Sequence, residues 1–142
     1  MSFKQLERGQ CGDSVSLDEF LASLNYNDDG LIPAIAQQYD SGEVLMMAWM
    51  NQAAIEETLK TSQVCYWSRS RQNYWRKGES SGNWQKLKSM KIDCDGDTLL
   101  LSVDQQGAAC HTARRHCFYL LVDSDKVLIN DAPMVDPDTL YK

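Results

Sequence analysis

The chain has 142 residues, of which 43% are hydrophobic and 24% charged, and its formal net charge at pH 7 is −6. This size and composition are typical of one folded domain and argue against a disordered chain. The net negative charge argues against bulk binding of nucleic acid, and no apolar run is long enough to span a membrane. The first ten residues lack the apolar stretch of a secretory signal, so we expect a cytoplasmic protein without a disulfide framework, despite five cysteines.

A short helix is the first predicted element, at residues 16–24, where Ser16 and Glu19 have the spacing of a capping box. The apolar side chains recur at helical intervals and are expected on one face: Leu17, Phe20, Leu21 and Leu24. The sequence DDG at 28–30 ends this element.

A hairpin and a second helix follow. Residues 31–38 and 43–50 are strand-like apolar runs on either side of YDSG at 39–42, which is typical of a turn. Residues 51–61 predict a helix, with Asn51 as its N-cap.

The remainder of the chain is strand-like. The expected strands lie at 64–70, 74–78, 84–95 and 98–103, and a final hairpin combines 117–122 with 126–130. We therefore expect a mainly β (α+β) fold, a folded mixed β-sheet or pseudo-barrel with two or so short helices. We interpret residues 1–142 as a single domain with core motifs at 31–118, an N-terminal helical region at 1–30 and a turn-rich tail at 131–142.

The sequence DCDGD at 93–97 places three aspartates at alternate positions. If this stretch is extended, Asp93, Asp95 and Asp97 share one face and Cys94 points to the other. Carboxylates suit a hard cation such as Mg²⁺, whereas a thiolate suits Zn²⁺. An ordinary surface turn is the alternative interpretation of the aspartates.

A second cysteine-containing motif is CHTARRHC at 110–117. Cys94, Cys110 and Cys117 have the spacing C-x15-C-x6-C, which matches no C-x2-C zinc module. A straight helix would separate the Cα atoms of Cys110 and Cys117 by about 10 Å. A shared zinc requires sulfurs within roughly 4 Å of each other, so the three-cysteine hypothesis requires this segment to bend. His111 is a candidate acid or base, or else a polar residue that holds the loop.

The basic residues are concentrated in residues 60–92, which hold eight of the fourteen Lys and Arg residues and one acid, Glu79. Aromatic residues are interspersed among these bases. The segment is open to three interpretations: binding of single-stranded RNA, two amphipathic strands, or a phosphate pocket for a small nucleotide. The acidity of the whole chain and the adjacent candidate metal ligands favour the pocket.

Four motifs together resemble the phosphoribosyl-AMP cyclohydrolase family of histidine biosynthesis, in its monofunctional form. They are LIPAIAQQYDSGEVLMMAWMN, YWSRSR, WRKGESSGNWQ and DCDGDTLLLSVDQQGAACHTARRHCF, which follow in order from Leu31 to Phe118. The resemblance implies a homodimeric hydrolase that opens the adenine ring of 1-(5-phosphoribosyl)-AMP at the N1–C6 bond, with zinc-bound hydroxide as nucleophile. The product is the formimino-aminoimidazole-carboxamide ribonucleotide.

The resemblance also implies the roles of individual residues. Cys94, Cys110 and Cys117 would hold Zn²⁺ shared across the dimer, and Asp93, Asp95 and Asp97 would hold Mg²⁺. We assign proton transfer to His111. By charge, we assign substrate binding to a set of basic residues: Arg69, Arg71, Arg76, Lys77, Arg114 and Arg115.

Two positions depart from the family pattern, which usually reads HTGRRSCF. If the glycine of that pattern has positive φ, Ala113 costs roughly 1 kcal/mol or shifts the loop. His116 replaces a serine, and would perturb the zinc site, supply a fourth ligand or have no effect. A non-catalytic, zinc-stabilised RNA-binding module is the alternative function. A zinc nucleobase deaminase is disfavoured because its H-x-E and P-C-x-x-C motifs do not occur here.

Overall fold

The computed structural model of the protein describes residues 3–139, so the last three residues of the predicted tail lie outside the described part. Its elements are α1 (Phe3–Leu6), α2 (Leu17–Ser23), β1 (Ile32–Gln38), β2 (Val44–Met50), α3 (Gln52–Thr61), β3 (Cys65–Ser68), β4 (Asn73–Arg76), β5 (Gln85–Ile92), β6 (Leu99–Gln105), β7 (Leu120–Asp123), β8 (Lys126–Ile129) and a 3-10 turn at Pro137–Thr139. No helix in this part of the chain is long and apolar enough to cross a membrane.

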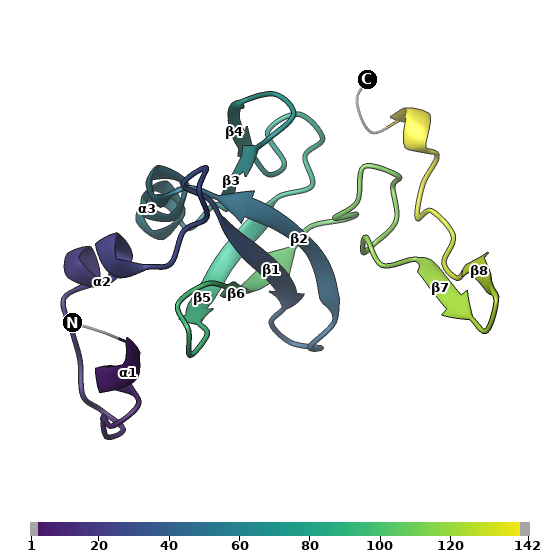
Figure 1. The fold of residues 1–142 in the computed structure, drawn as a ribbon. Helices are drawn as coiled ribbons and strands as arrows, with labels where there is room; N and C mark the ends of the chain where they lie inside the picture. Colours follow the sequence, from purple (N-terminus) through teal and green to yellow (C-terminus); the bar gives the residue numbers. More distant parts are fainter. Residues whose placement is uncertain (1–2, 140–142) are drawn as a thin grey trace.

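The centre of the fold is a six-stranded sheet in the order β4-β3-β2-β1-β6-β5. Strands β1 and β6 are parallel and the other neighbours are antiparallel, so the sheet is mixed. The sheet curls into a half-barrel with α2 and α3 at one side (Figure 1). The curl brings the chain just before β3 against β5, because Val64 N–H donates to the carbonyl of Gln85 and Leu87 N–H donates to that of Ser62. The predicted mainly β fold, with a folded mixed sheet and few short helices, is confirmed.

The hydrophobic core lies on the inner face of this half-barrel. Both β1 and β6 alternate buried and half-buried residues along their length, which is the period of a strand with one face in the core. Ile32 on β1, Leu99 on β6 and Ile55 on α3 are completely buried there.

The predicted helices form, with one difference in α2. The side chain of Asn51 accepts a hydrogen bond from Ala54 N–H and caps α3 as predicted. In α2, Leu21 and Leu24 are buried, but Leu17 is 55% exposed and the side chain of Ser16 makes no capping hydrogen bond. Phe20 is half-buried and packs against the core, so three of the four residues of the predicted apolar face contact the core. The predicted capping box is wrong, because the Ser16 side chain makes no capping hydrogen bond.

The chain leaves the sheet after β6 and ends in a separate hairpin. Residues 106–119 form turns, and β7 and β8 then pair only with each other. The hairpin stands to one side of the main sheet, away from α1, α2 and the turn between β5 and β6 (Figure 1).

Candidate active site

A cavity of about 380 Å³ opens beside β3 and β4. It combines cations, hydroxyl groups, an aromatic ring and a histidine: Ser68, Ser70, Arg71, Trp75, Lys77, Gly78, Ser80, Ser81 and His111 line it. The volume falls in the range of small-molecule sites, and two cations among hydroxyl groups suit a phosphate-bearing ligand.

A tight loop at residues 78–82 forms one wall of this cavity. Gly78 has φ +94°, and a Cβ added to it would lie 2.6 Å from Cα of Trp84, so only glycine fits this close approach. The N–H of Gly82 donates to the carbonyl of Gly78 and closes the loop. This geometry holds Ser80 and Ser81 at the cavity.

Lys77 connects the cavity with a pair of cysteines. It is 4% exposed, and its Nζ lies 5.4 Å from the centre of the Trp75 ring. Burial lowers the pKa of the Lys77 ammonium, while the nearby sulfurs of Cys117 and Cys110 act to raise it. The lysine therefore lies within electrostatic reach of both sulfurs and also lines the cavity.

The segment that carries Cys110 and Cys117 is bent, as the three-cysteine hypothesis requires. Ala113 N–H donates to the carbonyl of Cys110, and Cys110 N–H donates to that of Arg114, so the chain folds back on itself. Ala113 has φ 69° at this bend and is completely buried. Burial raises the pKa of the Cys117 thiol to about 12, and the neighbouring Cys110 contributes to that rise through charge and a hydrogen bond. The Cys110 thiol, which accepts a hydrogen bond from the Thr112 hydroxyl at 3.0 Å, is therefore near enough to Cys117 to raise its pKa.

Cys94 lies elsewhere in the same chain. It is exposed, in the turn between β5 and β6, beside Phe3 of α1. Within residues 3–139, the one group of three or more side chains close enough to share a metal consists of Asp93, Asp95 and Asp97. A single copy of the chain therefore brings together two of the three predicted zinc ligands.

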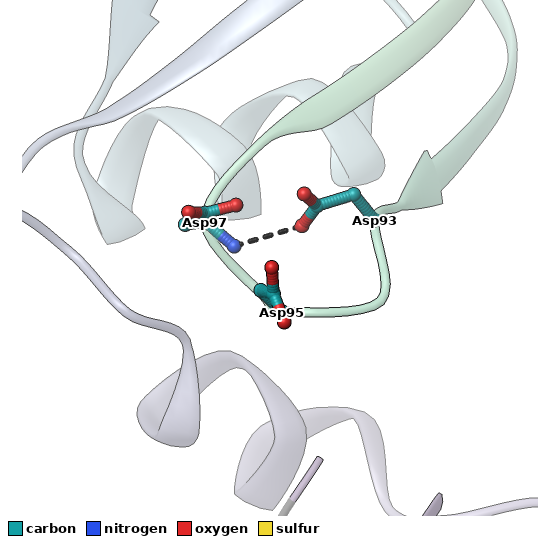
Figure 2. Close-up of side chains that lie close together, drawn as sticks. All are labelled: Asp93, Asp95 and Asp97. Atoms are coloured by element: carbon teal, nitrogen blue, oxygen red, sulfur yellow. Dashed lines mark hydrogen bonds between the residues drawn. The ribbon is translucent and has the colours of Figure 1, made fainter. Parts of the chain in front are cut away.

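The three aspartates converge, but not in the way that we predicted. Residues 93–97 form a turn, so the assumed extended strand with alternating faces is wrong. The Asp93 carboxylate accepts a hydrogen bond from the N–H of Asp97 at 2.9 Å (Figure 2). It also accepts one from the N–H of Thr98 at 3.2 Å, and the two bonds close the turn. One carboxylate oxygen from each of Asp93, Asp95 and Asp97 lies within 4.8 Å of the other two.

The pKa values of Asp93 and Asp97 shift in opposite directions. Burial acts to raise the pKa of Asp93, but its hydrogen bonds with Asp97, Thr98 and Gly96 lower it overall. A hydrogen bond with Asp93, together with burial and the charges of Asp93 and Asp95, raises the pKa of Asp97. A bound cation would offset the repulsion between Asp97 and the other two carboxylates, and oxygen ligands suit a hard cation.

The N-terminal region holds the aspartate turn in place. The Asn25 side chain donates to the carbonyl of Asp95 at 2.6 Å, and Asn25 N–H donates to that of Gly96 at 2.8 Å. The Phe3 ring lies over Gly96 and packs edge-on against Phe20. Nothing in the sequence pattern indicated the contacts of Asn25 and Phe3 with the turn, because they join residues seventy or more positions apart.

The predicted substrate-binding bases are dispersed. Arg71 and Lys77 line the cavity with His111. Arg69 lies over the ring of Trp49, and Arg76 forms a two-pronged ion pair with Glu57 at 2.8 and 2.9 Å.

The two arginines after the cysteine bend have partners of their own. Arg114 donates to the carbonyl of Asp131 and lies 4.0 Å from the centre of the Tyr119 ring. Arg115 pairs with Glu43 and donates to the carbonyls of Gln105 and Gly107. The roles of Arg69, Arg76, Arg114 and Arg115 in substrate binding stay predictions.

His116 also has partners on both sides of its ring. Nδ1 accepts the N–H of Phe118 at 3.1 Å, and Nε2 lies 3.1 Å from an oxygen of Asp131. These contacts join the cysteine bend to the segment after β8.

The bases, hydroxyl groups and histidine around this cavity are the residue types that an enzyme site for a phosphate-bearing substrate requires. Comparison with known proteins identifies the kind of enzyme. The family model for phosphoribosyl-AMP cyclohydrolase matches residues 46–119. The phosphoribosyl-AMP cyclohydrolase of Hydrogenovibrio crunogenus is 58% identical over 142 residues, which cover 100% of this chain and 97% of that protein. That of Chromohalobacter salexigens is 62% identical over 139 residues, 98% of this chain and 95% of the relative. That of Alkalilimnicola ehrlichii is 60% identical over 139 residues, 98% of both chains.

The chain belongs to the phosphoribosyl-AMP cyclohydrolase family. The resemblance carried by the motifs between Leu31 and Phe118 is therefore confirmed, as is the prediction of an enzyme. The RNA-binding module is not supported. Sequence reasoning named the cations and the histidine, but it did not name the hydroxyl groups of the cavity: Ser68, Ser70, Ser80 and Ser81.

Proposed function

We propose that this protein hydrolyses the N1–C6 bond of the adenine ring of 1-(5-phosphoribosyl)-AMP, a step of histidine biosynthesis in the cytoplasm, and that it acts without nucleic-acid or membrane partners. The observation that carries the proposal, beside family membership, is the cavity in which His111, Arg71 and Lys77 converge next to a thiol pair. A nucleotide with two phosphate-bearing ends requires cations and hydroxyl donors, and this cavity provides both.

The residues of the cavity have distinct roles in this proposal. Arg71 and Lys77 bind phosphate by charge, and the four serine hydroxyl groups donate hydrogen bonds to its oxygens. The Trp75 ring provides an apolar surface for the base. His111 lies on an exposed part of the loop at the cavity, where it can deliver a proton to N1 as the ring opens.

The donor atoms of the two candidate metal sites fit the two metals. Cys110 and Cys117 present two thiols that interact with each other, and thiolates are ligands that suit zinc. Zinc held there would lower the pKa of water and so supply the nucleophile for C6. Asp93, Asp95 and Asp97 present three clustered oxygens, which suit Mg²⁺.

A homodimer would complete the zinc ligands. Since Cys94 lies apart from Cys110 and Cys117 in one chain, we propose that Cys94 of a second copy is the third zinc ligand. The Mg²⁺ site of that copy would then lie next to the thiol pair of this one, because Cys94 is in the same turn as the aspartates.

Turnover by the purified, zinc-loaded protein with Mg²⁺ tests the proposal directly. We expect the ultraviolet absorbance change of ring opening with the wild type and with Cys11→Ala, whose thiol is exposed and outside the site. Cys110→Ala should lose both zinc and turnover. The absence of product from folded wild-type protein that contains both metals would refute the proposed function.

A further inference from the structure

The N-terminal segment 3–25, which we call the clasp, contacts the aspartate turn through both of its ends. At residue 25, the Asn25 side chain donates to the carbonyl of Asp95, and the Asn25 N–H donates to that of Gly96. At the other end, the Phe3 ring lies over Gly96 and packs edge-on against Phe20, with 5.3 Å between the ring centres. Two parts of one distant segment therefore hold the same turn.

Asn25 sets the relation between two of the three carboxylates. The two peptide groups between the Cα atoms of Asp95 and Asp97 carry the carbonyls of Asp95 and Gly96, and Asn25 donates to both. Because a peptide group is rigid, each bond fixes the orientation of one of these planes. Asp93 is joined to Asp97 separately, since its carboxylate accepts the Asp97 N–H. The mutual positions of the three carboxylates therefore depend on Asn25 as well as on Asp93.

Gly96 permits the close contact with Phe3. It has φ 69°, and a Cβ at this position would overlap the Phe3 ring. The glycine therefore turns the chain and also leaves the space in which the ring packs. Phe3 and Phe20 are partly buried and pack against the hydrophobic core. The ring of Phe3 thus joins the aspartate turn to the core.

The first part of the clasp has little packing of its own. Helix α1 has four residues, none of them buried, and every residue from 7 to 19 is exposed. An isolated helix shorter than about 12 residues is marginal in water, so α1 depends on contacts with the rest of the protein. The contact of Phe3 with Gly96 and Phe20 is such a contact, and it requires the turn to have its present shape.

We infer that Asn25 and Phe3 are positioning residues for the hard cation proposed at the aspartate turn, and that cation binding and docking of the clasp stabilise each other. The inference rests on the proposed function, because it presupposes that cation. The turn holds three carboxylate oxygens within 4.8 Å of one another, which is costly without a positive charge between them. A cation and the clasp both favour this geometry, so by linkage each strengthens binding of the other by the same factor.

The affinity for Mn²⁺ of matched variants in the full chain tests the inference. Loss of one hydrogen bond predicts binding that is weaker by about 2- to 10-fold in Asn25→Ala, and Phe3→Ala should weaken binding as well. Asn27→Ala is the control, because the Asn27 side chain accepts the N–H groups of Asp29 and Leu31 in the neighbouring loop. It should bind Mn²⁺ as the wild type does. Electron paramagnetic resonance of free Mn²⁺ gives the affinities, and circular dichroism and zinc per chain establish that each variant is intact.

Amide hydrogen exchange, followed by NMR with and without Mg²⁺, tests the reverse direction of the coupling. In the wild type, Mg²⁺ should slow exchange of the Asn25 amide, which is bonded to Gly96, and of the Glu7 amide, which is bonded to Phe3 in α1. Asp95→Asn should weaken this effect of Mg²⁺ on both amides. Exchange in β1 and β6 should not depend on Mg²⁺.

The outcomes separate this inference from the proposed cation site. An Mn²⁺ affinity unchanged in Asn25→Ala or in Phe3→Ala, or lowered as much in Asn27→Ala, would overturn the inference while the cation site remained. Exchange of Glu7 and Asn25 that does not respond to Mg²⁺ would do the same. If Asp95→Asn also binds Mn²⁺ as the wild type does, the proposed cation site is refuted together with the inference. None of these measurements uses turnover.

Discussion

The N–H of Cys117 donates a 2.7 Å hydrogen bond to the carbonyl oxygen of Leu45, on strand β2. This bond joins the cysteine bend to the central sheet across more than seventy residues of sequence, in addition to the bond from Arg115 to the carbonyl of Gln105 on β6. Leu45 is completely buried, so the bond lies at the edge of the core. The thiol of Cys117 is thereby fixed relative to the cavity, whereas the hairpin of β7 and β8 that follows it stands to one side of the main sheet (Figure 1).

Zinc binding should be restored by mixing two defective variants. Cys94→Ala and Cys110→Ala should each lack zinc alone. When equal amounts of the two variants exchange subunits, half of the dimers contain one chain of each variant. If the zinc ligands come from two chains, each of these mixed dimers has one intact zinc site and one defective site. The mixture should then contain about a quarter of the wild-type zinc and turnover.

Zinc per chain, measured by mass spectrometry of the metal after gel filtration, checks this. A mixture that contains no more zinc than the two variants alone would show that the three cysteines do not form a site across the dimer.

His111 should act on the chemical step. His111→Asn is expected to lower kcat by about 10²- to 10⁴-fold, the usual contribution of a general acid, with zinc content unchanged. The matched control is His116→Ser, because both ring nitrogens of His116 already have partners in Phe118 and Asp131. Steady-state kinetics of both variants compares the two histidines, and an equal loss of kcat in both would contradict the assignment of His111.

Arg71 should act on substrate binding. Arg71→Gln removes a cation from the cavity, and loss of a charged hydrogen bond of about 1.5–3 kcal/mol predicts a KM about 10- to 150-fold higher. Arg76→Gln should have a smaller effect, because its guanidinium is already paired with Glu57. Lys60→Gln, on the exposed surface of α3, is the control. An unchanged KM for Arg71→Gln would remove this residue from the proposed site.

Asp95 should contribute to binding of a hard cation. Asp95→Asn is preferable to a change at Asp93, whose carboxylate also closes the turn by accepting two N–H groups. Loss of one charged ligand predicts an affinity for Mn²⁺, used in place of Mg²⁺, that is weaker by about tenfold or more. Titration calorimetry measures this, with Asp40→Asn, an exposed carboxylate outside the turn, as control. Equal Mn²⁺ affinities in the two variants would show that Asp93, Asp95 and Asp97 form a turn and not a cation site.

Ala113 occupies a backbone conformation that favours glycine. Its φ of 69° confirms that this position has positive φ in this chain. Ala113→Gly would relieve about 1 kcal/mol of strain and lose about 0.8 kcal/mol from the buried methyl group, so the free energy of unfolding should change by less than about 0.5 kcal/mol. Ala113→Val should cost more than about 2 kcal/mol, because a β-branched side chain is strained at this φ and overpacks a buried site.

Urea unfolding at one fixed protein concentration measures both Ala113 variants. A Val variant as stable as the wild type would show that the bend relaxes without cost.

Local sequence signals predicted the helices and turns that are stabilised by contacts between neighbouring residues. Asn51 satisfies an N–H of the first turn of α3 within three residues, and the turn at 39–42 joins adjacent strands, so both could be predicted from neighbouring residues. For the stretch 93–97, the extended form assumed in the metal hypothesis is wrong, and the alternative interpretation as a turn is confirmed. Its shape depends on Gly96 with φ 69° and on contacts with Phe3 and Asn25, which are far away in the sequence.

The sequence by itself determined the family, the mainly β character and the residue types available for catalysis, because motifs and strand periodicity are properties of short segments. Only the tertiary structure decided which of these residues meet. It placed His111, Arg71 and Lys77 around one cavity, paired Cys110 with Cys117 and left Cys94 apart. The physical reason is that such distances depend on how the sheet curls and where the chain bends, and both are determined by packing and hydrogen bonds between residues far apart in sequence.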